Sequence, residues 1–178
     1  LDFTQFDMIY AGAQKNLGPA GATLVAVKPS ILGKSGRSIP SMLDYQTHID
    51  GESMFNTPPV FSVYTSLLTL RWMKEQGGLA AMEKVNTAKA ALLYNEIDRN
   101  RLFYGTAAAE DRSDMNACFL LQDESHAEVF NALWKEAGIV GIHGPRSVGG
   151  YRASMYNALP LESVQVLVEV MQHLEKTH

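Results

Sequence analysis

The strongest constraint on the fold is a pair of short apolar, β-rich segments, residues 7–11 and 22–27, that a glycine-rich stretch connects. Runs of this length and composition, bounded by glycine, predict strands. The connection, residues 12–21, consists mostly of small residues and predicts a tight link between the two strands. Residues 33–59 are predicted to be irregular because glycine and proline recur along them, and a loop of that length is uncommon unless it has a function.

The apolar pattern changes to a helical period at Val60, and helices and strands then alternate. The fold class is therefore α/β or α+β, with a domain boundary near Gly77-Gly78. Proline at residue 160 suits the first turn of a last helix. The spacing predicts helices over residues 60–76, 79–101, 126–137 and from 160 onward, and strands over residues 116–122, 139–143 and 151–156.

Composition excludes several classes of function. The formal net charge is −4 and Lys and Arg are scattered, so nucleic acid is not an expected partner. The longest apolar stretches, such as residues 22–27 and 164–171, are too short to span a bilayer, so no membrane partner is expected. The single cysteine, Cys118, rules out an intrachain disulfide and fits a reducing compartment, which predicts a cytoplasmic protein. Cys118 lies in an apolar run and is expected to be a small buried hydrophobe. No metal site is predicted, because paired ligand spacing is missing among the histidines: His48, His126, His143, His173 and His178.

Lys15 is the first candidate for chemistry. It lies in the connection between the first two strands, where small neighbours such as Gly12 and Gly18 let another molecule approach the backbone closely. Those neighbours also leave room for a ring beside the ammonium. A lysine that is partly removed from water becomes a usable amine nucleophile, as Schiff-base chemistry requires. The alternative is a solvated lysine in a turn, which composition alone favours.

Arg146 and Arg152 form a second candidate site, six residues apart across a Gly-Gly turn. Two guanidinium groups in one small region suit a dianionic ligand, because arginine binds carboxylate and phosphate with two parallel hydrogen bonds. The alternative is two surface arginines in ion pairs. Asn56 and Thr57 are a third candidate, since they precede a predicted helix and either cap it or bind an anion there.

Three stretches together resemble the phosphoserine aminotransferase family, a class V, fold-type I group of pyridoxal-phosphate enzymes. The resemblance runs in order and spacing over essentially all 178 residues. The first stretch is similar to the family's cofactor-lysine motif, and the other two to its second and third signatures. They read AGAQKNLGPAG at residues 11–21, MFNTPP at residues 54–59 and GGYRASMYNALP at residues 149–160.

The resemblance implies a domain plan and a cofactor, pyridoxal 5′-phosphate. Residues 1–76 correspond to the C-terminal segment of the large cofactor-binding domain, and residues 77–178 to a small α+β domain. Lys15 corresponds to the lysine that forms the internal aldimine and then moves the proton, and Gln14 to a residue that holds the cofactor phosphate. Asn56 and Thr57 correspond to residues that reach the phosphate of the neighbouring subunit's cofactor. A homodimer with shared active sites is therefore implied.

The implied reaction is transfer of an amino group between glutamate and 3-phosphohydroxypyruvate, which gives phosphoserine in serine biosynthesis. Arg152 corresponds to the residue that pairs with the substrate α-carboxylate, and Arg146 to the residue that pairs with the distal anionic group. Many family members have a histidine directly before the first arginine, but this chain has Pro145 there, and His143 is the nearest histidine. Proline cannot donate a hydrogen bond, so preference for a phosphorylated substrate is less firmly implied than aminotransferase chemistry.

Family members are considerably longer, and this chain begins without Met just before the lysine strand. A fragment is therefore expected, and it is expected to be inactive alone, because the residues that stack on the pyridine ring and pair with its nitrogen match nothing here. Two alternatives remain open. One is a related class V aminotransferase with a non-phosphorylated substrate, and the other is a non-catalytic dimerisation fragment.

Overall fold

The computed structural model describes residues 2–144 and 149–178 of the chain. Two compact units are present, Leu1–Glu75 and Gln76–His178. Both contain helices and strands, which confirms the predicted mixed α/β fold class.

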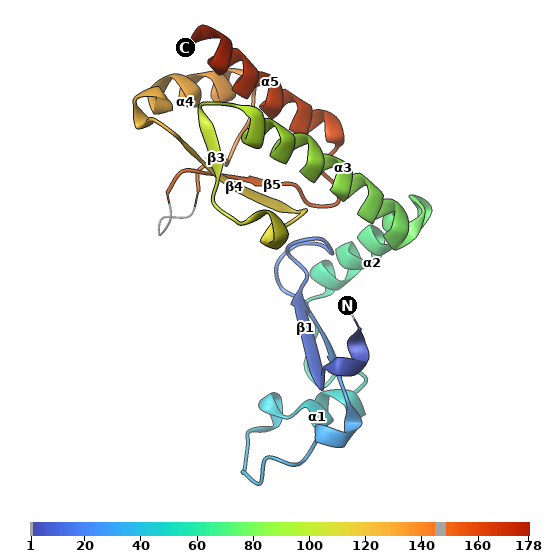
Figure 1. The fold of residues 1–178 in the computed structure, drawn as a ribbon. Coiled ribbons are helices and arrows are strands. Elements are labelled where there is room, and N and C mark those ends of the chain that lie inside the picture. Colours follow the sequence, from blue (N-terminus) through green and yellow to red (C-terminus); the bar gives the residue numbers. More distant parts are fainter. Residues whose placement is uncertain (1, 145–148) are drawn as a thin grey trace. The chain divides into compact units, whose positions relative to one another are not determined.

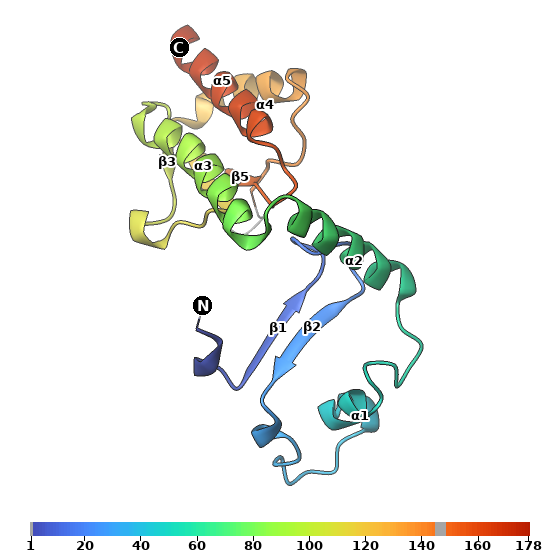
Figure 2. The same cartoon turned by 90° about the vertical axis from the view of Figure 1, so that its right-hand side faces the viewer.

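The first unit is built on a two-stranded antiparallel hairpin (Figure 2). Its strands are β1 (Met8–Gly12) and β2 (Thr23–Val27), so both predicted strands are confirmed to within one residue. The register pairs Met8 with Val27 and Gly12 with Thr23. The helices of this unit are α1 (Tyr45–Asp50) and α2 (Val60–Glu75), and short 3-10 turns lie at Phe3–Gln5, Pro29–Ile31 and Ser41–Leu43.

Helix α1 lies inside the stretch that was predicted to be irregular. Its start is stabilised by Asp44, whose side chain accepts a 3.0 Å hydrogen bond from the backbone N–H of Gln46. An aspartate at the N-cap satisfies one of the orphan donors of the first turn. The prediction was wrong here because a helix of six residues presents too few turns to give an apolar period.

The second unit is a three-stranded antiparallel sheet in the order β3–β4–β5, with helices packed on one face (Figure 1). Helix α3 runs beside α5, and α4 also packs on α5. The strands are β3 (Phe103–Gly105), β4 (Asn116–Leu121) and β5 (Tyr151–Ser154), and the helices are α3 (Gly78–Arg99), α4 (Ala127–Glu136) and α5 (Leu161–Thr177). Further 3-10 turns lie at Ala109–Asp111 and Glu124–His126.

The strand predicted over residues 139–143 is wrong. Only His143 pairs, in an isolated antiparallel bridge to Tyr151. Gly141 lies in the middle of this apolar stretch with φ +73°, a left-handed conformation that interrupts extended backbone. Strand β3 was not predicted, because three residues show no resolvable alternation.

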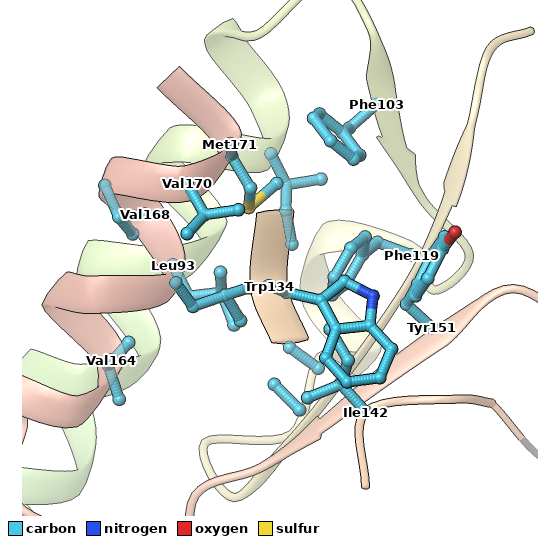
Figure 3. Close-up of a cluster of buried hydrophobic side chains, with 14 of the residues drawn as sticks. Leu93, Phe103, Phe119, Trp134, Ile142, Tyr151, Val164, Val168, Val170 and Met171 are labelled. Atoms are coloured by element: carbon cyan, nitrogen blue, oxygen red, sulfur yellow. The ribbon is translucent and has the colours of Figure 1, made fainter. Parts of the chain in front are cut away.

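Aromatic rings fill the space between the sheet and the helices of the second unit (Figure 3). Phe130 of α4 is fully buried, with ring centroids 5.0 Å from Phe103 and 4.8 Å from Tyr151 in edge-to-face geometry. Phe119 stacks on Tyr151 at 5.5 Å. Such pairs contribute about 0.5–1.5 kcal/mol each beyond the area that they bury. These contacts anchor β5 to the core, because the ring of Tyr151 lies against both Phe119 and Phe130.

The opposite face of the sheet is open. β4 and β5 each alternate between buried and more exposed residues, so one face meets the helices and the other does not. Cys118 lies on the open face and is half-buried, so the expectation of a buried side chain was wrong. The side chains on this face include Asn116, Cys118, Arg152 and Ser154.

Candidate functional site

Lys15 lies on a single helical turn that closes the β1–β2 hairpin. The carbonyl oxygen of Ala13 accepts backbone hydrogen bonds from Leu17 at 3.0 Å and Gly18 at 2.8 Å, and the Ala13 N–H donates to Ala22 at 2.9 Å. Ala13 is buried, whereas Gln14 and Lys15 are exposed. The turn therefore presents the amine of Lys15 on a loop whose backbone is fixed at its base.

Two serines on α2 lie against this loop, and one of them is hydrogen-bonded to it. The Ser62 hydroxyl donates a 2.8 Å hydrogen bond to the carbonyl oxygen of Ala20. Glycine lets the backbone approach this closely, because a Cβ on Gly21 would lie 2.6 Å from Ser62 Oγ and one on Gly18 would lie 2.8 Å from Ser66 Oγ. Sequence reasoning missed both serines, although their spacing of four residues places them on one face of a helix.

Gln14 folds over the end of β1. A Cβ at Gly12 would lie 2.4 Å from the side-chain Oε1 of Gln14, so no larger residue fits there without displacing the amide. The small residues beside Lys15 thus provide space that neighbouring side chains use. The approach of another molecule to this backbone, which the sequence predicts, stays a prediction.

Asn56 and Thr57 adjoin the Lys15 loop through the start of α2. Both are exposed, and the Asn56 side-chain amide donates a 3.2 Å hydrogen bond to the Thr57 carbonyl oxygen. A Cβ on Gly21 would lie 3.9 Å from Pro59, so the end of the lysine loop contacts the segment that follows Thr57. The first two motifs therefore belong to one region of the first unit.

The backbone before Asn56 is unusual. Ser53 adopts φ +65° and Glu52 adopts φ +50°, a left-handed conformation that is uncommon for residues other than glycine. His48 supports the same segment, because its Nε2 lies 3.0 Å from the Met42 carbonyl oxygen and its ring meets Phe55 edge-on at 6.0 Å. Left-handed non-glycine residues concentrate at functional sites, where the surrounding structure holds them.

Arg152 is exposed on the open face of the second unit's sheet. It pairs in register with Cys118, and its backbone N–H donates a 2.7 Å hydrogen bond to the Ile142 carbonyl oxygen. Ser154, two residues further along, lies on the same face and donates to Asn116 Oδ1 at 3.0 Å. Backbone pairing on both sides of Arg152 therefore holds a guanidinium at the surface, where an anion can reach it. Arg146 and Pro145 lie outside the described residues.

His143 occupies the opposite face of β5 from Arg152. Its ring stacks on Tyr151 at 6.1 Å and meets Trp134 edge-on at 5.3 Å. Tyr151 points into the core, where burial raises the pKa of its hydroxyl, which donates to Asn131 Oδ1 at 3.2 Å. His143 therefore lies on the Tyr151 side of the sheet, and Arg152 lies on the other side.

No cluster of three or more His, Cys, Asp or Glu side chains gathers in a metal-binding arrangement in the described part of the chain. None of the helices described combines the length and the apolar character needed to cross a bilayer.

Comparison with known proteins places these features in context. The model of the family described as aminotransferase class-V matches residues 1–167. A phosphoserine aminotransferase of Flavobacterium psychrophilum is 70% identical over 175 residues, which are 98% of this chain and 49% of that protein. A phosphoserine aminotransferase of Parabacteroides distasonis is 57% identical over 180 residues, covering 100% of this chain and 51% of that protein.

Solved structures agree with these relatives. The phosphoserine aminotransferase of Bacillus circulans subsp. alkalophilus superposes with a TM-score of 0.94 at 42% identity, over 99% of this chain and 49% of that one. A phosphoserine aminotransferase studied for radiation damage of its Schiff base gives 0.93 at 46% identity, over 100% of this chain and 49% of that one. The chain thus spans about half the length of the relatives it matches. Because the family model covers most of the chain, the chain belongs to the aminotransferase class-V family.

Proposed function

We propose that the protein carrying these residues is a pyridoxal-phosphate-dependent phosphoserine aminotransferase. It transfers an amino group between glutamate and 3-phosphohydroxypyruvate, as a cytoplasmic homodimer that serves serine biosynthesis. The names and the 55–70% identity of the relatives support this proposal. The observation that carries it is the exposed Lys15 on a turn of small residues, fixed to α2 by Ser62.

The residues around Lys15 fit pyridoxal phosphate. A Cβ on Gly18 would meet Ser66 and one on Gly12 would meet the movable amide of Gln14, so small residues keep the loop that carries Lys15 close to α2 and to Gln14. Lys15 supplies the amine that links the cofactor, and Gln14, Asn56 and Thr57 supply polar groups for a phosphate. When bound, the cofactor acts as the electron sink of the reaction.

Lys15 also has the proton-transfer role in this proposal. Its Nζ takes the proton from the substrate Cα and returns it during formation of the product. A base on a fixed loop performs this step more efficiently than a base on a mobile one, because misplacement by about 1 Å lowers such rates by about 10²-fold. The Ser62–Ala20 hydrogen bond therefore contributes to the chemistry through the position of the amine.

The two arginines bind the substrate. Arg152 pairs with the α-carboxylate and Arg146 with the distal phosphate or carboxylate. Hydrogen bonds to charged groups contribute about 1.5–3 kcal/mol each. The exposed position of Arg152 on the open sheet face supports this role.

Exposed apolar side chains of the first unit support a homodimer with shared sites. Tyr10 is 71% exposed, Leu24 65% and Phe61 73%, and other large apolar residues of β1, β2 and α2 are exposed as well. Large apolar side chains exposed in this number are typical of surfaces that other parts of a protein or a second subunit cover. In the proposed dimer, Asn56 and Thr57 bind the phosphate of the neighbouring subunit's cofactor. The exposed apolar side chains that the dimer does not cover are buried by the rest of the large domain to which the hairpin belongs.

A second candidate is a related class V aminotransferase that uses a non-phosphorylated substrate. The sequence at residue 145 favours it, because a proline stands where many family members have the histidine directly before the first arginine, and proline cannot donate a hydrogen bond. The choice of amino acceptor separates the two candidates. Phosphoserine aminotransferase activity predicts a much higher kcat/KM for 3-phosphohydroxypyruvate than for pyruvate.

The test is a comparison of Lys15→Ala with Lys34→Ala, an exposed loop lysine of the same unit. The longer protein that carries these residues, supplied with pyridoxal phosphate, is expected to gain a near-visible absorbance band and to transaminate glutamate with 3-phosphohydroxypyruvate. Lys15→Ala is expected to lose both, and Lys34→Ala to keep both. A protein that binds no cofactor supports the non-catalytic dimerisation fragment and contradicts the proposal.

A further inference from the structure

Lys89 is a fully buried lysine on α3, with 0% of its surface exposed. Its Nζ donates three hydrogen bonds to backbone carbonyl oxygens, those of Met155 at 3.0 Å, Tyr156 at 2.9 Å and Leu159 at 3.1 Å. An ammonium has three donors, so every one has an acceptor. The chain directly after β5 thus wraps around a single cation.

Burial of this ammonium is unfavourable unless its partners are well placed. Desolvation lowers the pKa of Lys89, which shows that the site penalises the charged form. A methionine or leucine at the same position on an apolar helix face would avoid this penalty. We therefore attribute to the lysine a role in holding the backbone: its three hydrogen bonds fix the conformation of residues 155–159.

Asn86, one turn earlier on α3, makes a second polar link to the same segment. It is 4% exposed, and its Nδ2 donates a 2.8 Å hydrogen bond to Asn157 Oδ1. Its own Oδ1 is buried without a hydrogen-bond partner among the described residues. The Asn86–Asn157 hydrogen bond attaches the segment after β5 to α3 at a second point.

This segment continues the strand that carries Arg152. Met155 follows β5 directly, and its N–H still pairs with the Met115 carbonyl oxygen at 2.7 Å. Lys89 thus joins the downstream end of the arginine strand to α3, from the face opposite the exposed guanidinium. The upstream end is held by the Arg152–Ile142 backbone hydrogen bond.

We propose that Lys89 is a positioning residue, which holds β5 and residues 155–159 so that Arg152 presents its guanidinium to a carboxylate of the substrate. This inference rests on the proposed function, in which Arg152 binds the α-carboxylate. Asn86 assists in the same role. Lys89 contacts no substrate, and its effect on substrate binding passes through the backbone of β5.

The experiment measures glutamate kinetics of the protein supplied with pyridoxal phosphate, in Lys89→Met and in the matched control Lys84→Met. Lys84 is an exposed lysine of the same helix. Lys89→Met keeps the length and apolar stem of the side chain but removes all three donors. It is expected to raise the KM for glutamate by about tenfold with kcat changed less than about twofold, as loss of ground-state binding predicts. Lys84→Met is expected to change neither.

A double-mutant cycle separates positioning from a merely structural role. In an Arg152→Gln background, Lys89→Met is expected to raise the KM by less than about twofold, because the group that it positions is already gone. An equal effect in both backgrounds, or an unchanged KM in folded Lys89→Met, overturns the proposal. If Lys89→Met does not fold, Asn86→Ala is measured in the same cycle, with an expected rise of about threefold.

Hydrogen exchange distinguishes failure of this inference from failure of the proposed function. The amides of Arg152 and Met155 are expected to exchange at least about tenfold faster in Lys89→Met than in Lys84→Met, while Ala117 in β4 keeps its protection. This result supports the positioning role even if the protein transaminates no substrate, in which case only the proposed function fails. Unchanged exchange at both amides overturns the positioning role.

Discussion

The Ser62 hydroxyl donates a 2.8 Å hydrogen bond to the Ala20 carbonyl oxygen, and this bond joins α2 to the loop that carries Lys15. The loop is hydrogen-bonded to the hairpin at its base and packed against a 16-residue helix at its side. The reactive amine is thus supported by two elements of the same unit. The packing depends on the glycines of the loop.

Gly18→Ala is expected to displace this loop. The new Cβ would lie 2.8 Å from Ser66 Oγ and 3.3 Å from the Ser66 backbone, and the backbone cannot yield. A displaced Lys15 is expected to weaken pyridoxal phosphate binding by about tenfold or more, measured by absorbance titration. Adding Ser66→Ala removes the nearest atom and is expected to restore part of the affinity. Gly36→Ala is the control, because a Cβ at Gly36 meets no other atom within 4 Å and strains only the local backbone at φ +61°. Equal affinity in Gly18→Ala and Gly36→Ala would show that the contact with α2 does not matter.

Phe130→Ala is expected to destabilise the second unit by about 3–5 kcal/mol, because it removes a fully buried ring and leaves a cavity. The ring contacts Phe103 and Tyr151, so β3 and β5 both lose support. Val129→Ala, on the same helix but 38% exposed, is the matched control and is expected to cost less than about 1 kcal/mol. Urea unfolding measures both values. A Phe130→Ala effect as small as the control would contradict the assigned core.

The stability of the second unit is expected to fall in acid through two ion-paired carboxylates. Hydrogen bonds from Arg112 lower the pKa of Asp98 from its ordinary 3.8, and hydrogen bonds from Arg99 and the Arg101 backbone lower the pKa of Glu175 from 4.5. A carboxylate with a lowered folded-state pKa stabilises the fold above its ordinary value, and this contribution is lost as the pH falls through the folded value. Most of the loss is therefore expected below pH 4.5.

The variant Asp98→Asn with Glu175→Gln tests this assignment. It is expected to be less stable at neutral pH. It is also expected to lose less stability between about pH 5 and pH 2, because the two amide side chains that replace the carboxylates take up no proton in this range. Glu83→Gln, on the exposed side of α3, is expected to follow the unmodified protein. If the free energy of unfolding falls with pH equally in the double variant and in the unmodified protein, these two carboxylates do not cause the loss of stability in acid.

Ser53→Gly is expected to stabilise the first unit by about 0.5–1 kcal/mol. Ser53 adopts φ +65°, where a Cβ is strained and glycine is not. Thermal unfolding measures the gain. Ser30→Gly, in a 3-10 turn with no such backbone, is expected to lower stability slightly because glycine loses more entropy on folding. A loss of stability in Ser53→Gly comparable to that in Ser30→Gly would mean that the left-handed backbone carries no strain.

Regular elements with a clear apolar period could be predicted from the sequence. The strands of the hairpin and the helices α2 and α3 begin and end within a residue or two of the predicted bounds, and α5 begins one residue after its predicted start. The apolar period of a short segment does not predict its structure where contacts with distant parts of the chain determine the backbone conformation. Residues 139–143 are apolar enough for a strand, but Gly141 takes a left-handed conformation and leaves only the bridge at His143.

The supports of the candidate site were harder to predict than its reactive groups. Lys15 and Arg152 stand out by residue type in short motifs. Ser62 and Lys89 do not, because a serine or a lysine on a helix usually faces water. Their roles depend on which loop folds against that helix, and local sequence does not determine such a contact.

The most direct test of the account is to trap the cofactor on the chain. The protein supplied with pyridoxal phosphate is reduced with borohydride, digested and analysed by mass spectrometry. The account predicts a pyridoxyl-phosphate adduct on the peptide that contains Lys15. An unmodified Lys15 peptide from protein that has bound the cofactor, or an adduct at a different lysine alone, would contradict it.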